Sequence, residues 1–496
     1  MAQVYRFHKE AQADMAHLGI DIGTSGVKLC VTDADGHVVA TADAALTSQH
    51  PFAGASEQDP DAWIAALQQA MAALPADLRL GIEVIGLSGQ MHGAVLLDRA
   101  RKPIRPAILW NDGRAVAECA DMAARVPKIG YITGVPPMPG FTAPKLLWLS
   151  RHEPEAHARI ATVLLPKDYV GLYLHGQLTT DPSDAAGTSW FDQHTGQWSQ
   201  VLCDASATDI AWLPPLLDGH EIAGQLTAQA AAALGLRPGL PVACGAGDGA
   251  AGAVGIGAVA PGDGFISLGT SGQLFVTTAR CLPNPDSRIH AYAHTLPDLW
   301  FQMAAMLNGA RPMAWLAELL GRPIADLLAE AEAAEPGPIF LPYLSGERTP
   351  HGDTDIRAGF WGLSEATSQG TLMRAVVEAI AFTFADAAAA LHAGGTRPTQ
   401  LLAIGGGTRS DFLLQMIADV MELPLGRSDA AEVGPALGAA RLGQMALGGA
   451  VADVATKPEI SRWFEPNAAV AARLAPRLAG YRALYPALKT VGAAMG

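Results

Sequence analysis

The residues LGIDIGTSGVK at positions 18–28 decide the fold, because a close copy of them, SLGTSGQLF, recurs at positions 267–275. Self-similarity at a wide spacing indicates a duplicated structural unit. In each copy an apolar run precedes the glycines and an apolar alternation follows them, which predicts a strand, a tight turn and a second strand. Rossmann and P-loop sites need a helix after the glycines, so neither motif is present here.

The two glycine turns offer groups suited to an anion. Glycine lets the backbone approach a ligand closely, and successive amide N–H groups with Thr and Ser hydroxyls form a small anion-binding concavity. Two such turns that face each other predict a site for one polyphosphate. A tight hairpin without a ligand is the alternative for either copy, but the presence of two copies argues against it.

The composition is that of a well-buried globular protein. The chain has 496 residues, 50% of them hydrophobic and 16% charged, which suits two large domains. A formal net charge of −15 at pH 7 argues against a nucleic-acid-binding face. The five cysteines are widely spaced and form no CxxC pair, so neither a disulfide framework nor a zinc site is indicated, and the cytoplasm is the expected compartment.

The ends and breaks of the chain give the expected domain limits. No apolar run reaches the roughly 18 residues that a membrane span needs. Residues 1–16 lack a signal-peptide core, and we expect them to be a disordered N-terminal extension. Pro261 and Gly262 break the pattern after an Ala- and Gly-rich helix, so we place a boundary between residues 258 and 259.

Local patterns predict the main elements. Residues 18–41 predict an antiparallel meander with a hairpin turn at DADG. Asp59 followed by Pro60 predicts an N-cap and a helix that runs to about Ala73. Further patterns predict helices at 303–320, 371–392, 411–421 and 435–447, a strand at 400–404 and a loop at 183–192.

A series of motifs between Leu18 and Leu447 resembles the FGGY carbohydrate kinases. In chain order they are DIGTSGVK, SEQDP, SGQMHG, RPAILWNDGR, PGFTAPKLLW, LLPKDY, SDAAGT, GDGAAGAVG, SLGTSG, FLPYLSGERTPH, IGGGTRS and VGPALGAARLG. One motif alone would be weak, but the ordered series is specific. The resemblance implies an α/β fold of two actin-like (ribonuclease H-like) domains with a central cleft, in which residues 17–258 bind sugar and residues 259–496 bind ATP.

By this resemblance Asp248, in GDGAAGAVG, is the general base. Phosphoryl transfer to a sugar needs a carboxylate within hydrogen-bond reach of the acceptor hydroxyl. Because the transition state is loose, positioning and charge neutralisation should contribute more than the base does. An N-cap for the following helix is the alternative role for this Asp, and the two roles are compatible.

Asp21 ends the first strand beside the glycine turn. A carboxylate next to phosphate in an acidic protein is repulsive unless a divalent cation lies between them, so we expect Asp21 to hold Mg²⁺ through water. The resemblance implies that this Asp supports catalysis. From local sequence alone, an Asp that stabilises its own turn is the alternative.

The GQMHG loop at 89–93 corresponds to the sugar-binding turn of the family. His92 can donate and accept hydrogen bonds with sugar oxygens, and Met91 offers an apolar wall. Trp110 and Asp112 are expected to line the same pocket. Without the motif, the alternatives are a surface His and a core Trp.

One position departs from the family pattern. Sugar kinases of this type usually have Asn or Gln after the catalytic Asp, and this chain has Gly249. A site without that hydrogen bond should discriminate less against sugars that lack the matching hydroxyl.

The residues expected to contact ATP lie in the two hairpins and a third glycine turn: Gly23, Thr24, Ser25, Lys28, Gly269, Thr270, Gly406, Gly407 and Ser410. For Lys28 the alternative is a strand residue that faces solvent. For the third turn the alternative is close packing of a strand against a helix. Glu347 and Arg348 are interpreted as structural residues that pair across the domain interface.

The resemblance implies an ATP- and Mg²⁺-dependent kinase that phosphorylates the 5-hydroxyl of a ketopentose, with D-xylulose as the first candidate. Another ketose or a polyol, such as ribulose or glycerol, is the alternative within the same chemistry. A non-kinase actin-like ATPase scaffold is the alternative from another class, although QMHG and SEQDP argue against it. The expected partners are sugar and ATP, without nucleic acid or membrane, and a homodimer is one option for the assembly.

Overall fold

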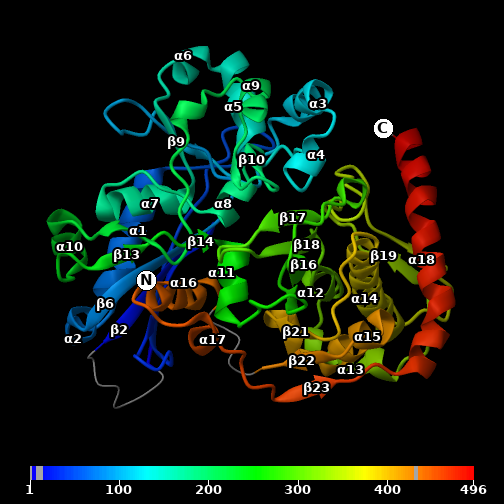
Figure 1. The fold of residues 1–496 in the computed structure, drawn as a ribbon. Coiled ribbons are helices and arrows are strands. Elements are labelled where there is room, and N and C mark those ends of the chain that lie inside the picture. The colour runs from blue at the N-terminus through cyan, green and yellow to red at the C-terminus, as the bar shows by residue number, and fades with distance from the viewer. Residues whose placement is uncertain (1–2, 7–14, 429–433, 496) are drawn as a thin grey trace.

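Two mixed β-sheets, one in each half of the chain, organise the computed structural model, which describes residues 3–6, 15–428 and 434–495 (Figure 1). The N-terminal sheet contains, in spatial order, β1 (Gln3–Arg6), β4 (Val38–Ala45), β3 (Gly26–Thr32), β2 (Ala16–Ile22), β6 (Ile82–Gly89), β13 (Pro241–Ala243) and β12 (Ile222–Gln225), with β14 (Ala246–Gly247) paired to β6. Strands β2, β3 and β4 form the predicted antiparallel meander, while β2 and β6 run parallel.

The C-terminal sheet repeats this plan. Its spatial order is β17 (His290–Ala293), β18 (Trp300–Met306), β16 (Gly272–Thr278), β15 (Gly264–Leu268), β21 (Leu401–Ile404), β22 (Leu425–Arg427) and β23 (Arg462–Phe464). Here too the glycine-turn strand β15 pairs antiparallel with β16 and parallel with β21. The predicted duplication and the two-domain α/β fold are therefore confirmed.

Helices cover both sheets. Those of the N-terminal half and its insertion are α1 (Pro60–Ala73), α2 (Ala76–Leu80), α3 (Val116–Arg125), α4 (Ile129–Ile132), α5 (Thr142–His152), α6 (Pro154–His157), α7 (Pro166–His175), α8 (Pro182–Ala186), α9 (Gln200–Ala205), α10 (Ala228–Leu234) and α11 (Asp248–Gly255). Those that follow are α12 (Arg311–Leu320), α13 (Ile324–Ala333), α14 (Gln369–Ala393), α15 (Asp411–Met421), α16 (Gly434–Ala446), α17 (Val451–Val454) and α18 (Ala468–Met495).

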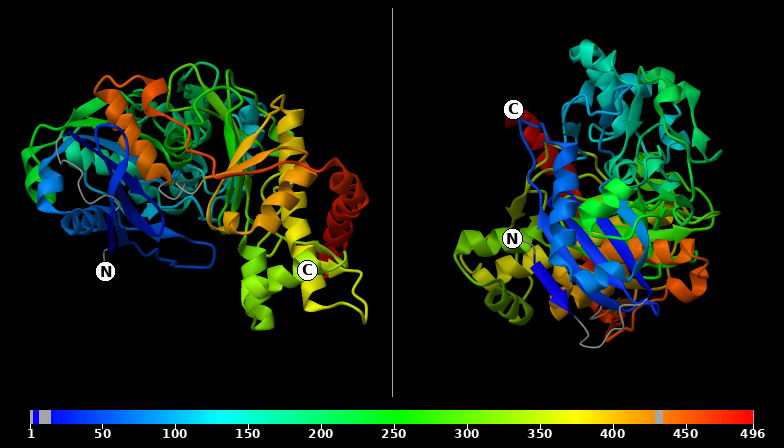
Figure 2. Two further views of the ribbon diagram at one scale, coloured as in Figure 1. Left: turned by 90° about the horizontal axis from the view of Figure 1, so that it is seen from below. Right: turned by 90° about the vertical axis from the view of Figure 1, so that its left-hand side faces the viewer.

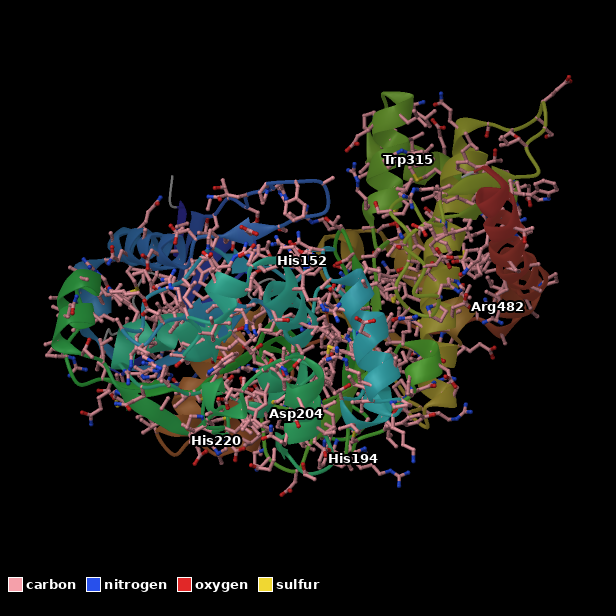
Figure 3. The ribbon with its side chains drawn as sticks, turned by 90° about the horizontal axis from the view of Figure 1, so that it is seen from above. His152, His194, Asp204, His220, Trp315 and Arg482 are labelled. Atoms are coloured by element: carbon pink, nitrogen blue, oxygen red, sulfur yellow. The ribbon has the colours of Figure 1, made fainter. Side chains whose placement is uncertain are left out.

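Short strand pairs complete the fold: β5 (Glu57–Gln58) with β8 (Ala107–Ile108), β7 (Val95–Leu97) with β9 (Thr162–Leu164), β10 (Phe191–Asp192) with β11 (Gln197–Trp198), and β19 (Ile339–Leu341) with β20 (Gly359–Trp361). In Figure 3, His152, His194, Asp204 and His220 mark the N-terminal half, and Trp315 and Arg482 mark α12 and α18 of the C-terminal half.

The helix α16 crosses the predicted domain boundary. It follows the C-terminal sheet in the chain but packs on β2 and β6 and against α11 (Figures 1 and 2). Glycines allow this contact, because a Cβ on Gly86 would lie 1.7 Å from the carbonyl oxygen of Ala439, and one on Gly438 would lie 1.7 Å from that of Ala251. Helix α16 therefore packs on the N-terminal sheet although it follows residue 258 in the chain.

Three other expectations need correction. Residues 3–6 of the expected disordered extension form β1, which pairs with β4, whereas residues 1–2 and 7–14 lie outside the described part of the chain. Residues 183–192 were expected to form a loop, but α8 starts there because Asp181 caps it by accepting the N–H of Ser183. The helix expected at 303–320 begins only at Arg311, because β18 occupies Trp300–Met306 between two strands.

Other expectations are confirmed. Helix α1 spans Pro60–Ala73, and the Asp59 carboxylate accepts the N–H of Asp61. Helix α14 is long and apolar enough to cross a membrane, but 89% of its most apolar window is buried inside the structure. This burial is that of a core helix. A further apolar cluster contains Met91, Val254, Phe275 and Leu442 and so joins the two halves.

Candidate active site

Two carboxylates lie at one edge of the N-terminal sheet. Asp21 on β2 is in register with Ser88 on β6, which is in register with Ala246 on β14. Asp248 follows β14 directly and is the first residue of α11. Because these strands are parallel, their carboxyl ends meet at the same edge, the usual place for ligands in α/β sheets. The two acids predicted to carry the chemistry are thus brought together.

The surroundings favour a proton on Asp248. Desolvation by the surrounding chain and repulsion from Asp21 raise its pKa to about 7, against a smaller lowering by the N–H of Gly249. The residue itself is exposed to solvent, which screens the effect. The pKa of Asp248 is still raised, because desolvation and the charge of Asp21 both act in that direction. A carboxylate with a pKa near the working pH is suited to accept a proton in a reaction.

Asp248 does not cap the helix that follows it, so the alternative role considered above is wrong. Gly247 is the N-cap of α11, and Asp248 is already helical. Its Oδ1 accepts the N–H of Gly249 at 2.8 Å. An added Cβ on Gly249 would meet no heavy atom within 4 Å, so the position where related kinases carry an amide is open.

Asp21 is bound to a neighbouring strand rather than to its own turn. Its Oδ1 accepts the hydroxyl of Ser88 at 3.1 Å, and Lys28 lies opposite it on β3. Burial raises its pKa to about 6, while Ser88 and Lys28 lower it. A nearly buried carboxylate with little neutralising charge fits a divalent cation. The side-chain group of three possible metal ligands found in the described chain lies elsewhere, at Asp33, Asp35 and His37, so phosphates would have to complete a metal site at Asp21.

The loop after β6 holds His92 in a fixed orientation. His92 has a backbone φ of 70°, its ring stacks on Phe141 with centroids 4.5 Å apart, and its Nδ1 lies 2.6 Å from the carbonyl oxygen of Gly187. Since a carbonyl only accepts, Nδ1 carries the hydrogen and Nε2 is left as an acceptor. Burial also holds the pKa of His92 well below its usual value. A neutral His92 can therefore accept a hydrogen bond from a sugar hydroxyl.

Met91 fills the space between this loop and the strand before Asp248. It is 7% exposed, and an added Cβ on Gly247 would lie 2.9 Å from its Cγ. An added Cβ on Gly187 would lie 2.9 Å from its Cε. Met91 therefore lies next to Gly247, the residue that precedes Asp248.

Trp110 connects this region to the first glycine turn. Its Nε1 donates to the Thr24 hydroxyl at 2.8 Å, and that hydroxyl donates to Oε1 of Gln90, also at 2.8 Å. The Thr24 hydroxyl is thus already hydrogen-bonded to Gln90 and Trp110, which precede and follow the loop of Met91 and His92 in the N-terminal half. Of its predicted phosphate contacts, only the backbone amide is free of this network, while the neighbouring side chains of Ser25 and Lys28 are exposed.

Asp112 does not line a pocket, contrary to the prediction. Its carboxylate accepts the N–H of Ser56 at 2.7 Å and two side-chain N–H groups of Arg114 at 2.8 Å each. Its side chain has no exposed area. Arg114 also pairs with Glu57 at 2.6 Å, so Asp112 belongs to a buried ion-pair network that supports the loop of Trp110.

Those residues of the C-terminal half that are expected to contact ATP gather at one edge of its sheet. Ser267 on β15 is in register with Ile404 on β21, so the glycine turns that follow both strands are adjacent. Close packing explains Gly407, where an added Cβ would lie 2.8 Å from Cβ of Leu268, but Gly406 is open on all sides within 4 Å. Thr270 is exposed, and Ser410 caps α15 by accepting the N–H of Leu413.

The sequence reasoning missed two side chains of this region. Gln90 lies inside the GQMHG motif and bonds Thr24, and Phe141 lies in the PGFTAPKLLW motif and stacks on His92. Arg348, expected to pair across the domain interface, makes no ion pair within the described residues but lies over the ring of Trp110. Glu347 instead accepts the N–H of Leu307 at 2.6 Å and that of Arg348 at 2.8 Å. The motifs marked these segments, but nothing in the sequence specified these contacts.

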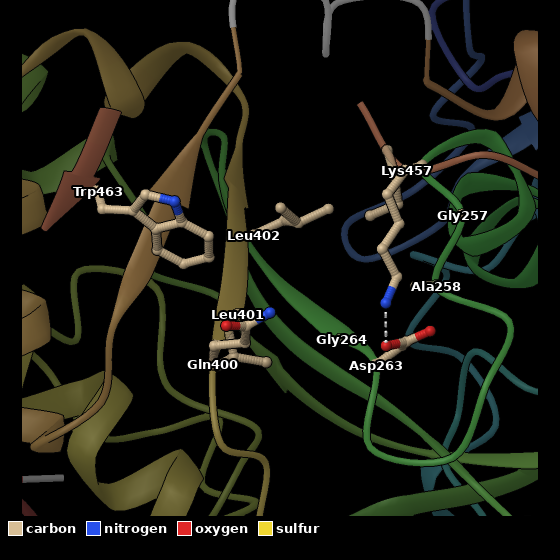
Figure 4. Close-up of a pocket in the computed structure, with 10 residues that line it drawn as sticks. Gly257, Ala258, Asp263, Gly264, Gln400, Leu401, Leu402, Lys457 and Trp463 are labelled. Carbon is tan, nitrogen blue, oxygen red and sulfur yellow. Dashed lines mark hydrogen bonds and ion pairs between the residues drawn. The ribbon is translucent and has the colours of Figure 1, made fainter. Parts of the chain in front are cut away.

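A separate small cavity of about 30 Å³ lies at the opposite ends of β15 and β21 (Figure 4). It is lined by Gly264, Leu401 and Trp463 and flanked by the ion pair of Lys457 with Asp263. It is therefore distinct from the region of Asp21 and Asp248.

Comparisons with known proteins agree with this arrangement. The profile of the FGGY family of carbohydrate kinases, N-terminal domain, matches residues 16–255, and that of the C-terminal domain matches residues 264–447. Xylulose kinase of Escherichia coli (strain K12) is 43% identical over 479 residues, which cover 95% of this chain and 99% of that protein. Xylulose kinase of Bacillus subtilis (strain 168) is 34% identical and covers 87% and 88% of the two chains.

Solved structures are similar throughout their length. A crystal structure described as a "xyloylose kinase" from Brucella ovis has a TM-score of 0.92 at 43% identity and covers 96% of this chain and all of its own. Ligand-bound xylulose kinase from Lactobacillus acidophilus has a TM-score of 0.92 at 26% identity and covers 97% of this chain and all of its own.

Proposed function

The chain belongs to the FGGY family of carbohydrate kinases, and from that premise we propose that it transfers the γ-phosphoryl group of ATP to the 5-hydroxyl of D-xylulose, giving D-xylulose 5-phosphate and ADP. The relatives named xylulose kinase support the substrate. The observation that carries the proposal is the pairing of Asp21 with Asp248 at one sheet edge, beside the loop of Met91 and His92.

Asp248 is the general base in this proposal. As the 5-oxygen of the sugar bonds to the γ-phosphorus, the bond from that phosphorus to the bridging oxygen of ADP breaks, and the hydroxyl proton passes to the carboxylate of Asp248. Its raised pKa makes it a better proton acceptor than an ordinary Asp would be. Met91 excludes water on one side, and Nε2 of His92 accepts from another sugar hydroxyl and orients the ring or chain of the substrate.

The two glycine turns are proposed to hold the triphosphate. Backbone amides of residues 24–25 and 269–271 and the exposed hydroxyls of Ser25 and Thr270 are available as donors, whereas the N–H of Gly23 donates to the carbonyl oxygen of Gly26 at 3.0 Å. The open Gly406, with Gly407 and Ser410 beside it, is proposed to border the adenosine. Mg²⁺, bound to phosphate oxygens and to Asp21 through water, would neutralise the charge that develops on phosphate. Lys28, opposite Asp21, adds a positive charge on the same face.

A panel of acceptors tests the proposal. ADP formation is measured with D-xylulose, D-ribulose, L-ribulose, L-xylulose and glycerol, each with Mg²⁺ and ATP, and the product is identified by phosphorus NMR. We expect the highest kcat/KM with D-xylulose. A higher value for another acceptor would change the substrate but keep the chemistry. ATP hydrolysis that no sugar accelerates would support the actin-like scaffold instead.

The cytoplasm is the proposed compartment. The five cysteines are free, three of them buried, as is usual for a protein in a reducing environment. The oligomeric state belongs to the same set of proposals, and sedimentation of the purified protein distinguishes a monomer from the homodimer considered above.

A further inference from the structure

Arg348 brings the C-terminal half of the chain to the proposed sugar site. It lies in the segment between β19 and β20, and its guanidinium lies over the ring of Trp110, 5.1 Å from the centroid. Trp110 belongs to the N-terminal half and bonds Thr24. The contact therefore spans the two halves beside the proposed sugar site.

The guanidinium of Arg348 has no polar partner in the described part of the chain. Its neighbour Glu347 is 1% exposed and uses its carboxylate for Leu307, Asn308 and the backbone N–H of Arg348. No hydrogen bond or ion pair of the Arg348 guanidinium occurs within residues 3–6, 15–428 and 434–495. A half-buried guanidinium has five N–H donors, and leaving them without an acceptor costs free energy unless a ligand supplies one.

The groups around Arg348 belong to the sugar side of the site. Its charge acts on His92 and on His290. His290 is 4% exposed, its ring lies edge-on to Phe141 at 6.0 Å, and both of its ring nitrogens are buried without a partner. Phe141 in turn stacks on His92. Two histidines, an aromatic ring and the guanidinium, contributed by both halves, thus lie close to one another.

The charge of Arg348 acts on the two histidines and is not among the main causes that shift the pKa of either acid. The pKa of Asp248 is raised by the charge of Asp21, and the pKa of Asp21 is lowered by the charge of Lys28. A ketose offers the guanidinium a suitable acceptor at the end of its chain opposite the 5-hydroxyl. The carbonyl oxygen of a ketose only accepts hydrogen bonds, whereas its hydroxyls can serve the acceptor Nε2 of His92.

We propose that Arg348 is a substrate-binding residue contributed by the C-terminal half, and that its guanidinium donates to the carbonyl oxygen of the bound ketose. This inference rests on the proposed function and adds to it the residue that distinguishes a ketose from a polyol. Arg presents a planar fork of donors that Lys cannot reproduce. The sugar then contacts both halves of the chain, so its binding should also stabilise the contact between the two halves.

The test compares Arg348→Ala and Arg348→Lys with wild type and with Arg357→Ala. Arg357 is an exposed residue of the same segment, and its guanidinium bonds only nearby backbone carbonyls, so it controls for the loss of one positive charge. Steady-state KM is measured for D-xylulose and for ATP. Xylitol, the polyol of the same carbon skeleton, is measured as a substrate or as a competitive inhibitor.

For Arg348→Ala we expect the KM for D-xylulose to rise by about 10- to 100-fold, the range for one hydrogen bond to a charged group. The KM for ATP should change by less than about twofold, and the preference for D-xylulose over xylitol should shrink by the same factor as the KM rises. Arg348→Lys should recover only part of the affinity, and Arg357→Ala should behave as wild type.

Equal losses for D-xylulose and xylitol, or an unchanged KM for D-xylulose, would overturn the inference while leaving the proposed function in place. If Arg348→Ala does not fold, as judged by thermal unfolding and ATP binding, the same comparison with Arg348→Lys decides. A wild-type protein inactive with every ketose would overturn the proposed function and this inference together.

Discussion

The two glycine hairpins of this protein have nearly the same sequence but different surroundings. In the first, Asp21 precedes the turn, lies opposite Lys28 and is bonded to Ser88. In the second, Ser267 holds the corresponding place and lies opposite Gln273. The first turn is tied to the sugar side by Thr24 and Trp110, whereas the second abuts a glycine turn that is open at Gly406.

This difference teaches how a duplicated unit can serve two substrates. Backbone amides at a tight turn are provided by both copies and suit phosphate irrespective of side chains. Only the N-terminal half provides acidic side chains beside its turn. Asp21 lies on β2, and Asp248 begins α11. The division predicts that chemistry fails when the N-terminal acids are removed, and that equivalent changes in the C-terminal hairpin affect it less.

The largest effect is expected for Asp248→Ala. Loss of a general base costs about 10²- to 10⁴-fold in rate, so kcat should fall by this amount while ATP binding, measured by calorimetry, changes little. Asp326→Ala, a change of an exposed acid on α13, is the matched control. Wild-type turnover in Asp248→Ala would remove this residue from the mechanism.

The second prediction compares Asp21→Asn with Ser267→Ala. If Asp21 holds Mg²⁺ through water, its amide variant should need about 10- to 100-fold more Mg²⁺ for half-maximal activity, the range for residues that act on a metal from outside its ligand shell. Ser267→Ala should leave the Mg²⁺ requirement near that of wild type. Titration of the rate with Mg²⁺ at saturating ATP measures both, and equal shifts would mean that the two hairpins do not differ in metal binding.

The third prediction concerns pH. Asp248 accepts a proton only when ionised, and its pKa is raised to about 7 from an ordinary value of about 3.9. The kcat/KM for D-xylulose should therefore be level above pH ~7 and fall by up to about tenfold per pH unit below it. Repulsion from Asp21 contributes to the shift, so Asp21→Asn should move this fall to lower pH. An acid limb near pH ~4 in the wild type would contradict the raised pKa.

The smallest effect is expected for Gly249→Asn. The position has room for a side chain, since an added Cβ meets nothing within 4 Å. The new amide can donate to or accept from a sugar hydroxyl and should change the relative KM values among ketoses by a few-fold, about 1 kcal/mol or less. Gly113→Ala, at an exposed glycine whose added Cβ would lie 3.6 Å from its nearest neighbour, is the control. Identical ketose profiles would show that the absent amide has no part in selectivity.

Much of the fold could be predicted because its signals are local. Asp59 and Pro60 specified the start of α1, and the alternation of apolar residues around each glycine turn specified both hairpins. The acids were predictable for the same reason, since each stands at the end of a strand. The sequence predicts a helix where residues 303–306 belong to a strand, because β18 is apolar at every position except Gln302 and is buried between two neighbours, so it lacks the alternation of a half-exposed strand.

The amino-acid sequence by itself determined the duplicated strand, turn and strand, the small residues that allow close packing, and the acids at the ends of two strands, because each depends on neighbours in the chain. Only the tertiary structure decided that α16 returns to the first sheet, that Asp112 is enclosed by Arg114, and that Arg348 reaches Trp110. These contacts join residues far apart in the chain or depend on which of several possible partners is near, and packing alone brings such groups together.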